Sequence, residues 1–335
     1  MKLIRKILFP FVPIYYLVTW LRNICFDIGV FKSKSYDFPI ICVGNLSVGG
    51  TGKTPMIEYL IKLLKNKYKV ATLSRGYKRT TNGFQVANKA SNALTIGDEP
   101  YQFYKKFDDI IVSVDSDRQN GIENLLKIKY SPEIILLDDA FQHRKVKAGF
   151  NILLTTYNKL YVNDLSLPTG DLREAKLGAK RAHVIVVTKC PDSISNERKN
   201  EIIKQINPLT NQYVFFSSIK YSDTIYSTQL SRPIEDLKKE KFTLVTGIAN
   251  VKPLLRYLNN EGYNFEHLNF KDHHRFTDAE IKEINNKCLV LTTEKDFTRL
   301  KDCIDSNKLY YLPIESKIIE SNKFNMLIEQ FVSSY

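Results

Sequence analysis

Residues 41–64 read ICVGNLSVGGTGKTPMIEYLIKLL. An apolar run typical of a strand comes first, a glycine-rich turn follows, and Pro55 opens a helical stretch at a position where its missing N–H is tolerated. Such a turn can close backbone N–H groups around phosphate oxygens, while Lys53 reaches the terminal phosphates and the Thr54 hydroxyl binds Mg²⁺. The stretch therefore predicts a P-loop nucleotide site formed by Ser47, Val48, Gly49, Gly50, Thr51, Gly52, Lys53 and Thr54.

The strict P-loop pattern GxxxxGK[ST] has glycine at the position of Ser47. The structural alternative is a glycine-rich turn that carries a solvated lysine. Three glycines followed by Lys53 and Thr54, between a strand and a helix, favour the nucleotide site.

A second motif, LLDDAFQHR at residues 136–144, supplies carboxylates to the same site. Asp138 and Asp139 end an apolar run, which is the arrangement of the Walker B aspartate in P-loop proteins. An aspartate pair after a strand also commonly caps a helix, and this is the alternative. With a P-loop upstream, we predict that Thr54, Asp138 and Asp139 hold Mg²⁺, and that Gln142 and His143 extend the loop toward the reaction centre.

The apolar runs between residues 39 and 189 alternate with helical stretches, and their polar ends lie on the C-terminal side. This pattern predicts a mostly parallel sheet with helices on both faces and ligands at the carboxyl ends of the strands. The fold class is α/β: a P-loop NTPase-like three-layer α/β/α domain and a smaller second α/β domain. The predicted division is a membrane-associated helix at 1–30, the P-loop domain at 31–210, an extended β-ribbon linker at 211–238 and the smaller domain at 239–335.

The chain has 335 residues and a formal net charge of +13, which favours anionic partners. No basic stripe interleaved with aromatic residues is present, so we expect no nucleic-acid partner. The five cysteines form no CxxC pair, which indicates a reducing compartment and argues against a zinc site.

Basic residues at the N-terminus precede a charge-free run at residues 7–21. The run is shorter than the roughly 20 apolar residues that cross a bilayer, and Pro10 and Pro13 interrupt it. We expect a helix that lies on or dips into the membrane. An ordinary buried helix and a cleaved signal peptide are the alternatives, although no small-x-small cleavage site follows.

Nine motifs in one order carry a resemblance to a known family: SVGGTGKTP, LSRGYKR, GDEPYQF, DSDRQNG, DDAFQHR, LPTGDLRE with RAHVIVVTK, GIANVKP, DHHRF and TTEKD. From about residue 38 to 300, the chain resembles the tetraacyldisaccharide 4′-kinases. The resemblance implies transfer of the ATP γ-phosphate, with Mg²⁺, to the 4′-hydroxyl of an acylated disaccharide 1-phosphate, giving lipid IVA in Gram-negative bacteria. Ala140, Asp171 and Ala175 depart from the family pattern without removing a functional side chain.

The resemblance also implies a catalytic pair. Asp98, in the GDEP motif, is the candidate base that accepts or orients the hydroxyl proton, and Glu99 is the fallback. His273 is the candidate that holds this carboxylate, in preference to His274. A turn aspartate and a solvated loop histidine are the structural alternatives.

Arginines at strand ends and in the motif loops are usually solvent-exposed surface residues that bind no ligand. Here ATP and a phosphorylated lipid require several cations, and arginine can grip phosphate with two N–H groups. We predict contacts to the phosphates or the acceptor from Arg75, Arg118, Gln142, His143, Arg173 and Glu174.

Two other functions remain open from the sequence. One is a soluble P-loop kinase of a small metabolite, which would not float with lipid vesicles. The other is a P-loop NTPase switch, which would not release ADP in response to an acceptor. The preferred interpretation is a lipid kinase on the cytoplasmic face of the bacterial inner membrane, bound to the membrane surface and without a predicted protein partner.

Overall fold

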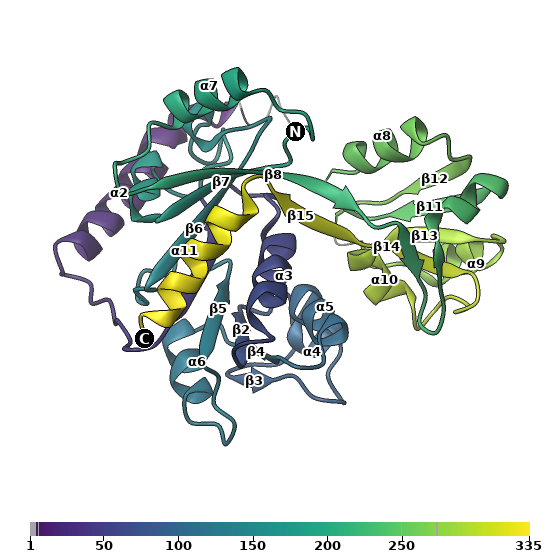
Figure 1. Cartoon of the computed structure of the whole chain (residues 1–335), viewed down its shortest axis with the longest axis horizontal. Coiled ribbons are helices and arrows are strands. Elements are labelled where there is room, and N and C mark those ends of the chain that lie inside the picture. The colour runs from purple at the N-terminus through teal and green to yellow at the C-terminus, as the bar shows by residue number, and fades with distance from the viewer. Residues whose placement is uncertain (1–4, 6, 249, 273) are drawn as a thin grey trace.

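The computed structural model describes residues 5, 7–248, 250–272 and 274–335, which form two β-sheets with helices around them (Figure 1). The larger sheet has nine strands in the order β15-β8-β7-β6-β1-β5-β2-β4-β3. Its six central strands run parallel: β1 (Ile40–Asn45), β2 (Val70–Ser74), β4 (Ile111–Val114), β5 (Ile134–Asp138), β6 (Phe150–Thr156) and β7 (Val184–Thr188). These strands match the predicted apolar runs, because a parallel strand covered on both faces needs apolar residues in succession.

Two apolar clusters lie on opposite faces of this sheet. One joins the strands to α3 (Lys53–Leu64), α5 (Asp98–Lys106) and α11 (Ser321–Ser333) through Leu60, Phe103 and Phe324. The other joins them to α6 (Arg118–Leu125) and α7 (Asn196–Ile206) through Ile122 and Ile202. The three-layer α/β/α arrangement is therefore confirmed. The remaining elements of this part are β3 (Gln85–Val86), α4 (Ala93–Ile96), η2 (Tyr161–Asn163) and η3 (Lys176–Arg181).

The smaller sheet has six strands in the order β10-β9-β14-β13-β11-β12. The strands β11 (Phe242–Thr246), β12 (Phe265–Asn269), β13 (Val290–Thr293) and β14 (Leu309–Leu312) run parallel, and β9 (Thr224–Tyr226) and β10 (Ser231–Pro233) form an antiparallel edge. Its helices are η4 (Ile234–Lys239), α8 (Lys252–Asn260), α9 (Asp278–Asn285) and α10 (Glu294–Leu300). This is the predicted second α/β unit.

The strand pairing differs from the predicted division at two places. β8 (Tyr213–Tyr221) lies in the predicted linker, yet it pairs parallel with β7 of the larger sheet. β15 (Ile314–Ile318) and α11 lie in the predicted smaller domain, yet β15 pairs antiparallel with β8 and α11 packs on the first core. The reason is apolar burial, since Phe215, Ile318 and Phe324 join one cluster on the larger sheet. The chain thus leaves the first unit along β8 and returns along β15 (Figure 1).

The N-terminal segment forms η1 (Phe9–Phe11) and α2 (Val12–Asp27) on the outside of the larger unit. Its outer side chains remain exposed, among them Phe9, Phe11, Ile14, Leu17, Val18 and Leu21. On its inner side, the Tyr15 hydroxyl donates to the carbonyl of Arg173 (2.8 Å), and Asn23 Nδ2 donates to Glu174 (2.9 Å). The alternative of an ordinary buried helix is therefore wrong. Within the described residues, no helix combines the length and apolarity that a membrane crossing requires.

Candidate active site

A cavity of about 1070 Å³ lies between the two units, at the carboxyl ends of the strands of the larger sheet. All eight predicted P-loop residues line it, and so do Asp138, Asp139, Arg75, Gln142, His143 and Arg173. The smaller unit contributes Ile248, Asn250, Asp272 and Lys295 from its loops and helix ends. The predicted site is therefore a cleft with walls from both units.

The P-loop turn adopts a conformation that its glycines permit. Gly49 and Gly52 have φ of +108° and +90°, a region that residues with a side chain rarely enter. Gly52 is the N-cap of α3, so Lys53 and Thr54 begin the helix at the end that attracts phosphate. Ser47 takes the position of the first glycine without a positive φ, and its neighbour Val48 donates its N–H to the carbonyl of Asp171 (2.7 Å).

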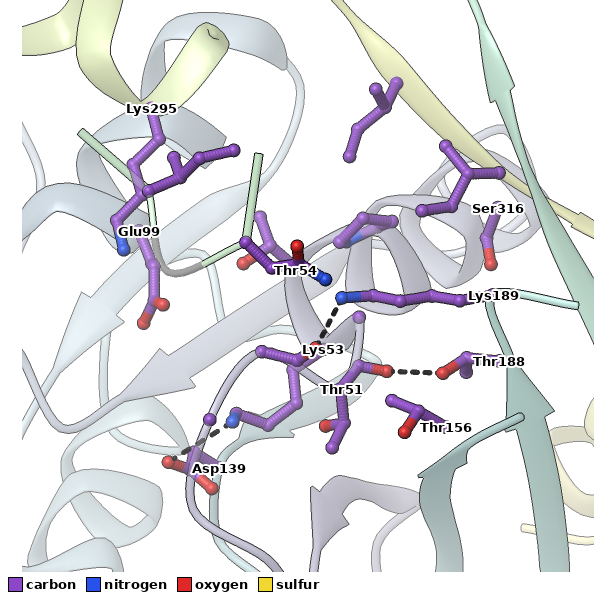
Figure 2. A pocket seen from close by; sticks show the side chains of 18 of the residues that line it. Thr51, Lys53, Thr54, Glu99, Asp139, Thr156, Thr188, Lys189, Lys295 and Ser316 are labelled. Atoms are coloured by element: carbon purple, nitrogen blue, oxygen red, sulfur yellow. Dashed lines mark hydrogen bonds and ion pairs between the residues drawn. The ribbon is translucent and has the colours of Figure 1, made fainter. Parts of the chain in front are cut away.

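Two side chains at the end of β7 fix the P-loop from the other side (Figure 2). The Thr188 hydroxyl donates to the carbonyl of Thr51 (2.8 Å), and Lys189 Nζ donates to the carbonyl of Gly50 (2.6 Å). Burial lowers the pKa of Lys189. The sequence interpretation did not assign Thr188 or Lys189 to the site, although they end the motif RAHVIVVTK.

Asp139 is held by two cations of the cavity. Lys53 Nζ lies 3.6 Å from Asp139 Oδ2 and Arg173 Nη1 lies 3.0 Å from Asp139 Oδ1 (Figure 2 shows the lysine contact). Burial alone would raise the pKa of Asp139, but Lys53 and Arg173 together hold it below its ordinary value. Arg173 thus lies where it can contact a phosphate that Lys53 also reaches.

Asp138 is buried and short of partners. The Ser74 hydroxyl donates to its Oδ2 at 3.2 Å, whereas Oδ1 accepts no hydrogen bond from the part of the chain that the structure describes. Burial, followed by the charges of Glu99 and Asp139, raises the pKa of Asp138 to about 7. A buried carboxylate oxygen that lacks a hydrogen-bond partner and lies close to two other carboxylates favours the binding of a cation at this position.

Two residues predicted to contact the substrate, Arg118 and Glu174, are buried and do not line the cavity. Arg118 is only 1% exposed and does not line the cavity; its guanidinium donates to the carbonyls of Asp115 and Asp138. Glu174 is 3% exposed and accepts from Arg181 and Gln142. Both side chains therefore support the loops of the site and do not face its ligand.

His143 lines the cavity in its neutral form. Burial, with the nearby charges of Arg118 and Arg75, lowers its pKa to about 4. A neutral imidazole can accept or donate one hydrogen bond at neutral pH without adding charge.

The candidate base Asp98 lies at the first turn of α5, where it forms an ion pair with Arg299 of α10. Asp98 does not line the cavity, whereas Glu99 does. His273 lies outside the described residues, so its pairing with Asp98 stays a prediction. His274 Nε2 lies 2.9 Å from Glu280 Oε2, and its ring stacks on Phe270, which is a structural role at the start of α9.

Further contacts join α5 to the smaller unit. Lys106 Nζ lies 2.7 Å from the buried Glu58 of α3 and 2.9 Å from Glu294 of α10. Lys301 donates to the Tyr101 hydroxyl at 2.7 Å. The helix that carries Asp98 and Glu99 is thereby attached to both walls of the cleft.

Comparison with known proteins gives consistent matches over nearly the whole chain. A family model described as tetraacyldisaccharide-1-P 4′-kinase matches residues 4–333. A tetraacyldisaccharide 4′-kinase of Flavobacterium johnsoniae is 53% identical over 99% of this chain and 98% of its own length. One from Bacteroides fragilis is 45% identical over 96% of this chain and 91% of its own. The crystal structure of LpxK from Aquifex aeolicus in complex with ATP superposes with a TM-score of 0.79 at 30% identity, covering 98% and 99% of the two chains.

Proposed function

The chain belongs to the tetraacyldisaccharide-1-P 4′-kinase family, and on that premise we propose which of its residues perform the reaction. The protein is an ATP-dependent kinase of lipid A biosynthesis that phosphorylates the 4′-hydroxyl of a tetraacyldisaccharide 1-phosphate, giving lipid IVA. The soluble metabolite kinase and the NTPase switch are thereby set aside. The observation that carries the residue assignment is the meeting of Lys53, Arg173 and Asp139 beside the P-loop.

Lys53 and Arg173 stabilise the charge of the transferred phosphoryl group in this proposal. Phosphoryl transfer depends mainly on positioning and on cations placed where negative charge develops. Both side chains line the cavity and both already contact one carboxylate, Asp139. An incoming phosphate would compete for these two cations, and Arg75 lines the same cavity as a third.

Mg²⁺ fits the carboxylates of the site. Among the described residues, no group of three or more His, Cys, Asp or Glu side chains is arranged to bind a metal ion by itself. Mg²⁺ does not need such a cage, since it is usually held by one or two carboxylates together with nucleotide phosphates and water. The unpartnered Oδ1 of Asp138 suits this ion, with Asp139 and the Thr54 hydroxyl as further ligands. When bound, Mg²⁺ would neutralise charge on the phosphates.

Asp98 is the proposed base, and His273 is proposed to orient it. The contact between Arg299 and Asp98 supports this assignment, because Arg299 belongs to the unit that also carries His273. Asp98 would have to turn from Arg299 toward the cavity, which a movement of the smaller unit could bring about. Glu99, the neighbour that lines the cavity, stays the fallback for this role.

The outer face of η1 and α2 is the proposed membrane contact. Phe9, Phe11 and Ile14 are each more than half exposed, and water is a poor environment for so many neighbouring apolar side chains. A helix that lies in the interface buries such a face among lipid chains while its other face stays on the protein. Because ATP is cytosolic, we propose that the protein binds the cytoplasmic face of the inner membrane, with no protein partner required.

One transfer assay tests the function directly. The full-length protein is incubated with γ-labelled ATP, Mg²⁺ and a tetraacylated disaccharide 1-phosphate, and the lipid is then extracted. Label in the organic phase, dependent on the acceptor and lost in Lys53→Ala, is the expected result. Release of labelled inorganic phosphate without labelled lipid would contradict the function.

A further inference from the structure

The inner face of α2 is bonded to the loop that carries Arg173. The Tyr15 hydroxyl donates to the carbonyl of Arg173 (2.8 Å), and Asn23 Nδ2 donates to the carboxylate of Glu174 (2.9 Å). Asn23 is buried, although much of the same helix lies at the surface. A helix that served only to hold the protein on a membrane would not need polar contacts with a loop of the active site. These two contacts therefore indicate a second role for α2.

The backbone of Arg173 is held from both sides. Its N–H donates to the carbonyl of Leu46 (2.7 Å), just before the P-loop, while its carbonyl accepts the hydroxyl from α2. Two residues earlier, the carbonyl of Asp171 accepts the N–H of Val48 (2.7 Å), so the loop runs beside the P-loop turn. From this backbone, the Arg173 guanidinium reaches Asp139 at 3.0 Å. The contacts of the backbone thus set where this cation lies in the cavity.

Glu174 links α2 to the other loops of the site. Its buried carboxylate accepts hydrogen bonds from three segments of the chain, through Asn23, Gln142 (2.8 Å) and Arg181 (2.9 Å). Gln142 Nε2 also donates to the carbonyl of Asn45 at the end of β1 (2.8 Å). A buried carboxylate costs free energy unless donors surround it, so the loss of one donor weakens the attachment of the whole loop.

We propose that Tyr15 and Asn23 are positioning residues of the phosphoryl transfer: they hold the Arg173–Glu174 segment so that Arg173 contacts the transferred phosphate. The inference rests on the proposed function, in which Arg173 stabilises the charge of that phosphate. A small displacement of a cation from the place where negative charge develops lowers the rate of the chemical step, whereas it need not change the binding of the substrates. The helix that contacts the membrane with its outer face thus helps to assemble the active site with its inner face.

A kinetic comparison separates this positioning role from membrane attachment. Transfer by the full-length protein is measured over a range of ATP and acceptor concentrations in Tyr15→Phe and Asn23→Ala, each of which removes one donor of α2. Tyr15→Phe should lower kcat about threefold, and Asn23→Ala, which loses a bond to a charged group, should lower it about tenfold. Both KM values should stay within about twofold of wild type. Flotation with vesicles should not change, because the outer face of the helix is intact.

A second set of variants tests whether the effect passes through Arg173. Arg173→Ala should itself lower kcat by about 10²-fold. In that background, Tyr15→Phe and Asn23→Ala should each change kcat by less than about 1.5-fold, because the cation that they position is absent. Tyr130→Phe, which removes an exposed hydroxyl outside the cavity, is the matched control and should leave kcat unchanged in both backgrounds.

Other outcomes contradict the positioning role. Equal fold losses in the wild-type and Arg173→Ala backgrounds would show that the two residues do not act through Arg173, and an unchanged kcat in both single variants would exclude them. A raised KM for the acceptor at unchanged kcat would assign them to acceptor binding instead. If Asn23→Ala does not fold, Tyr15→Phe keeps the aromatic ring in place and carries the test alone. Failure of wild type to label the lipid, or full activity of Arg173→Ala, would instead contradict the proposed function.

Discussion

Arg299 in the smaller unit forms an ion pair with Asp98 in the larger one. Arg299 also lies 3.2 Å from the buried carboxylate of Asp296, which accepts the N–H of Gly247 at 2.8 Å. Arg299 and Asp296 therefore connect the candidate base Asp98 to Gly247, in the loop after β11. Movement of the smaller unit would change the environment of Asp98 directly.

The first prediction concerns Asp98 and His273 as one unit. Asp98→Ala and His273→Ala should each lower kcat by about 10²-fold or more, the range of general acid–base catalysis. The double variant should be little worse than the poorer single variant, since each residue acts through the other. Transfer rates at saturating ATP and acceptor measure this. Multiplicative losses, or a larger effect of His274→Ala than of His273→Ala, would show that the pair is wrongly assigned.

The second prediction concerns Lys53, the P-loop lysine that we propose contacts the transferred phosphate. Lys53→Ala should lower kcat by about 10²-fold or more, because Lys53 meets the charge that grows on the transferred phosphoryl group. The midpoint of thermal unfolding should change little, since among the described residues the ion pair of this lysine is with the cavity carboxylate Asp139, at 3.6 Å. Lys65→Ala, at the C-cap of the same helix and paired with Asp109 at the surface, is the matched control. A folded Lys53→Ala with more than half of wild-type activity would exclude the assignment.

The third prediction concerns the exposed face of the N-terminal helix. Replacing Phe11, Leu17 and Leu21 together by Gln should abolish flotation with anionic vesicles at high salt, where the basic surface no longer holds the protein. ATP binding should persist, because the substituted side chains face away from the cavity. The same change at Leu165, Leu177 and Leu209, which are exposed elsewhere, is the control. Equal flotation of both variants would refute the membrane role of this face.

The fourth prediction concerns pH and stability. Because the pKa of Asp138 is raised to about 7 from an ordinary 3.8, the folded protein binds more protons than the unfolded chain between these values. Its stability without nucleotide should therefore fall as pH rises through this window. Asp138→Asn should melt higher than wild type at pH 8 by about 2 °C or more, and the difference should vanish near pH 4. Glu58, whose pKa burial also raises to about 7, is present in both proteins, so the comparison isolates Asp138. A difference that does not depend on pH would contradict this account.

The elements that sequence predicted well are those defined by local patterns. The P-loop at residues 47–54 and the strand before Asp138 depend on residues within one turn or strand, and the structure brings their side chains into one cavity. Arg118 was misjudged because its motif suggested a phosphate contact, while its burial depends on strands 20 or more residues away in sequence. The return of β15 to the larger sheet was missed for the same reason. Strand partners are chosen by long-range apolar burial, which periodicity along the chain does not report.

The course of the chain along β8 and β15 has a consequence for limited proteolysis. A protease that cuts once within the surface loops between residues 222 and 313 would leave one fragment that contains β8 and another that contains β15. The hydrogen bonds between these strands, and the packing of Phe324 and Ile328 on the first core, would keep the two pieces together. We expect such nicked protein to migrate as an intact molecule in gel filtration and to separate into two bands only under denaturing conditions.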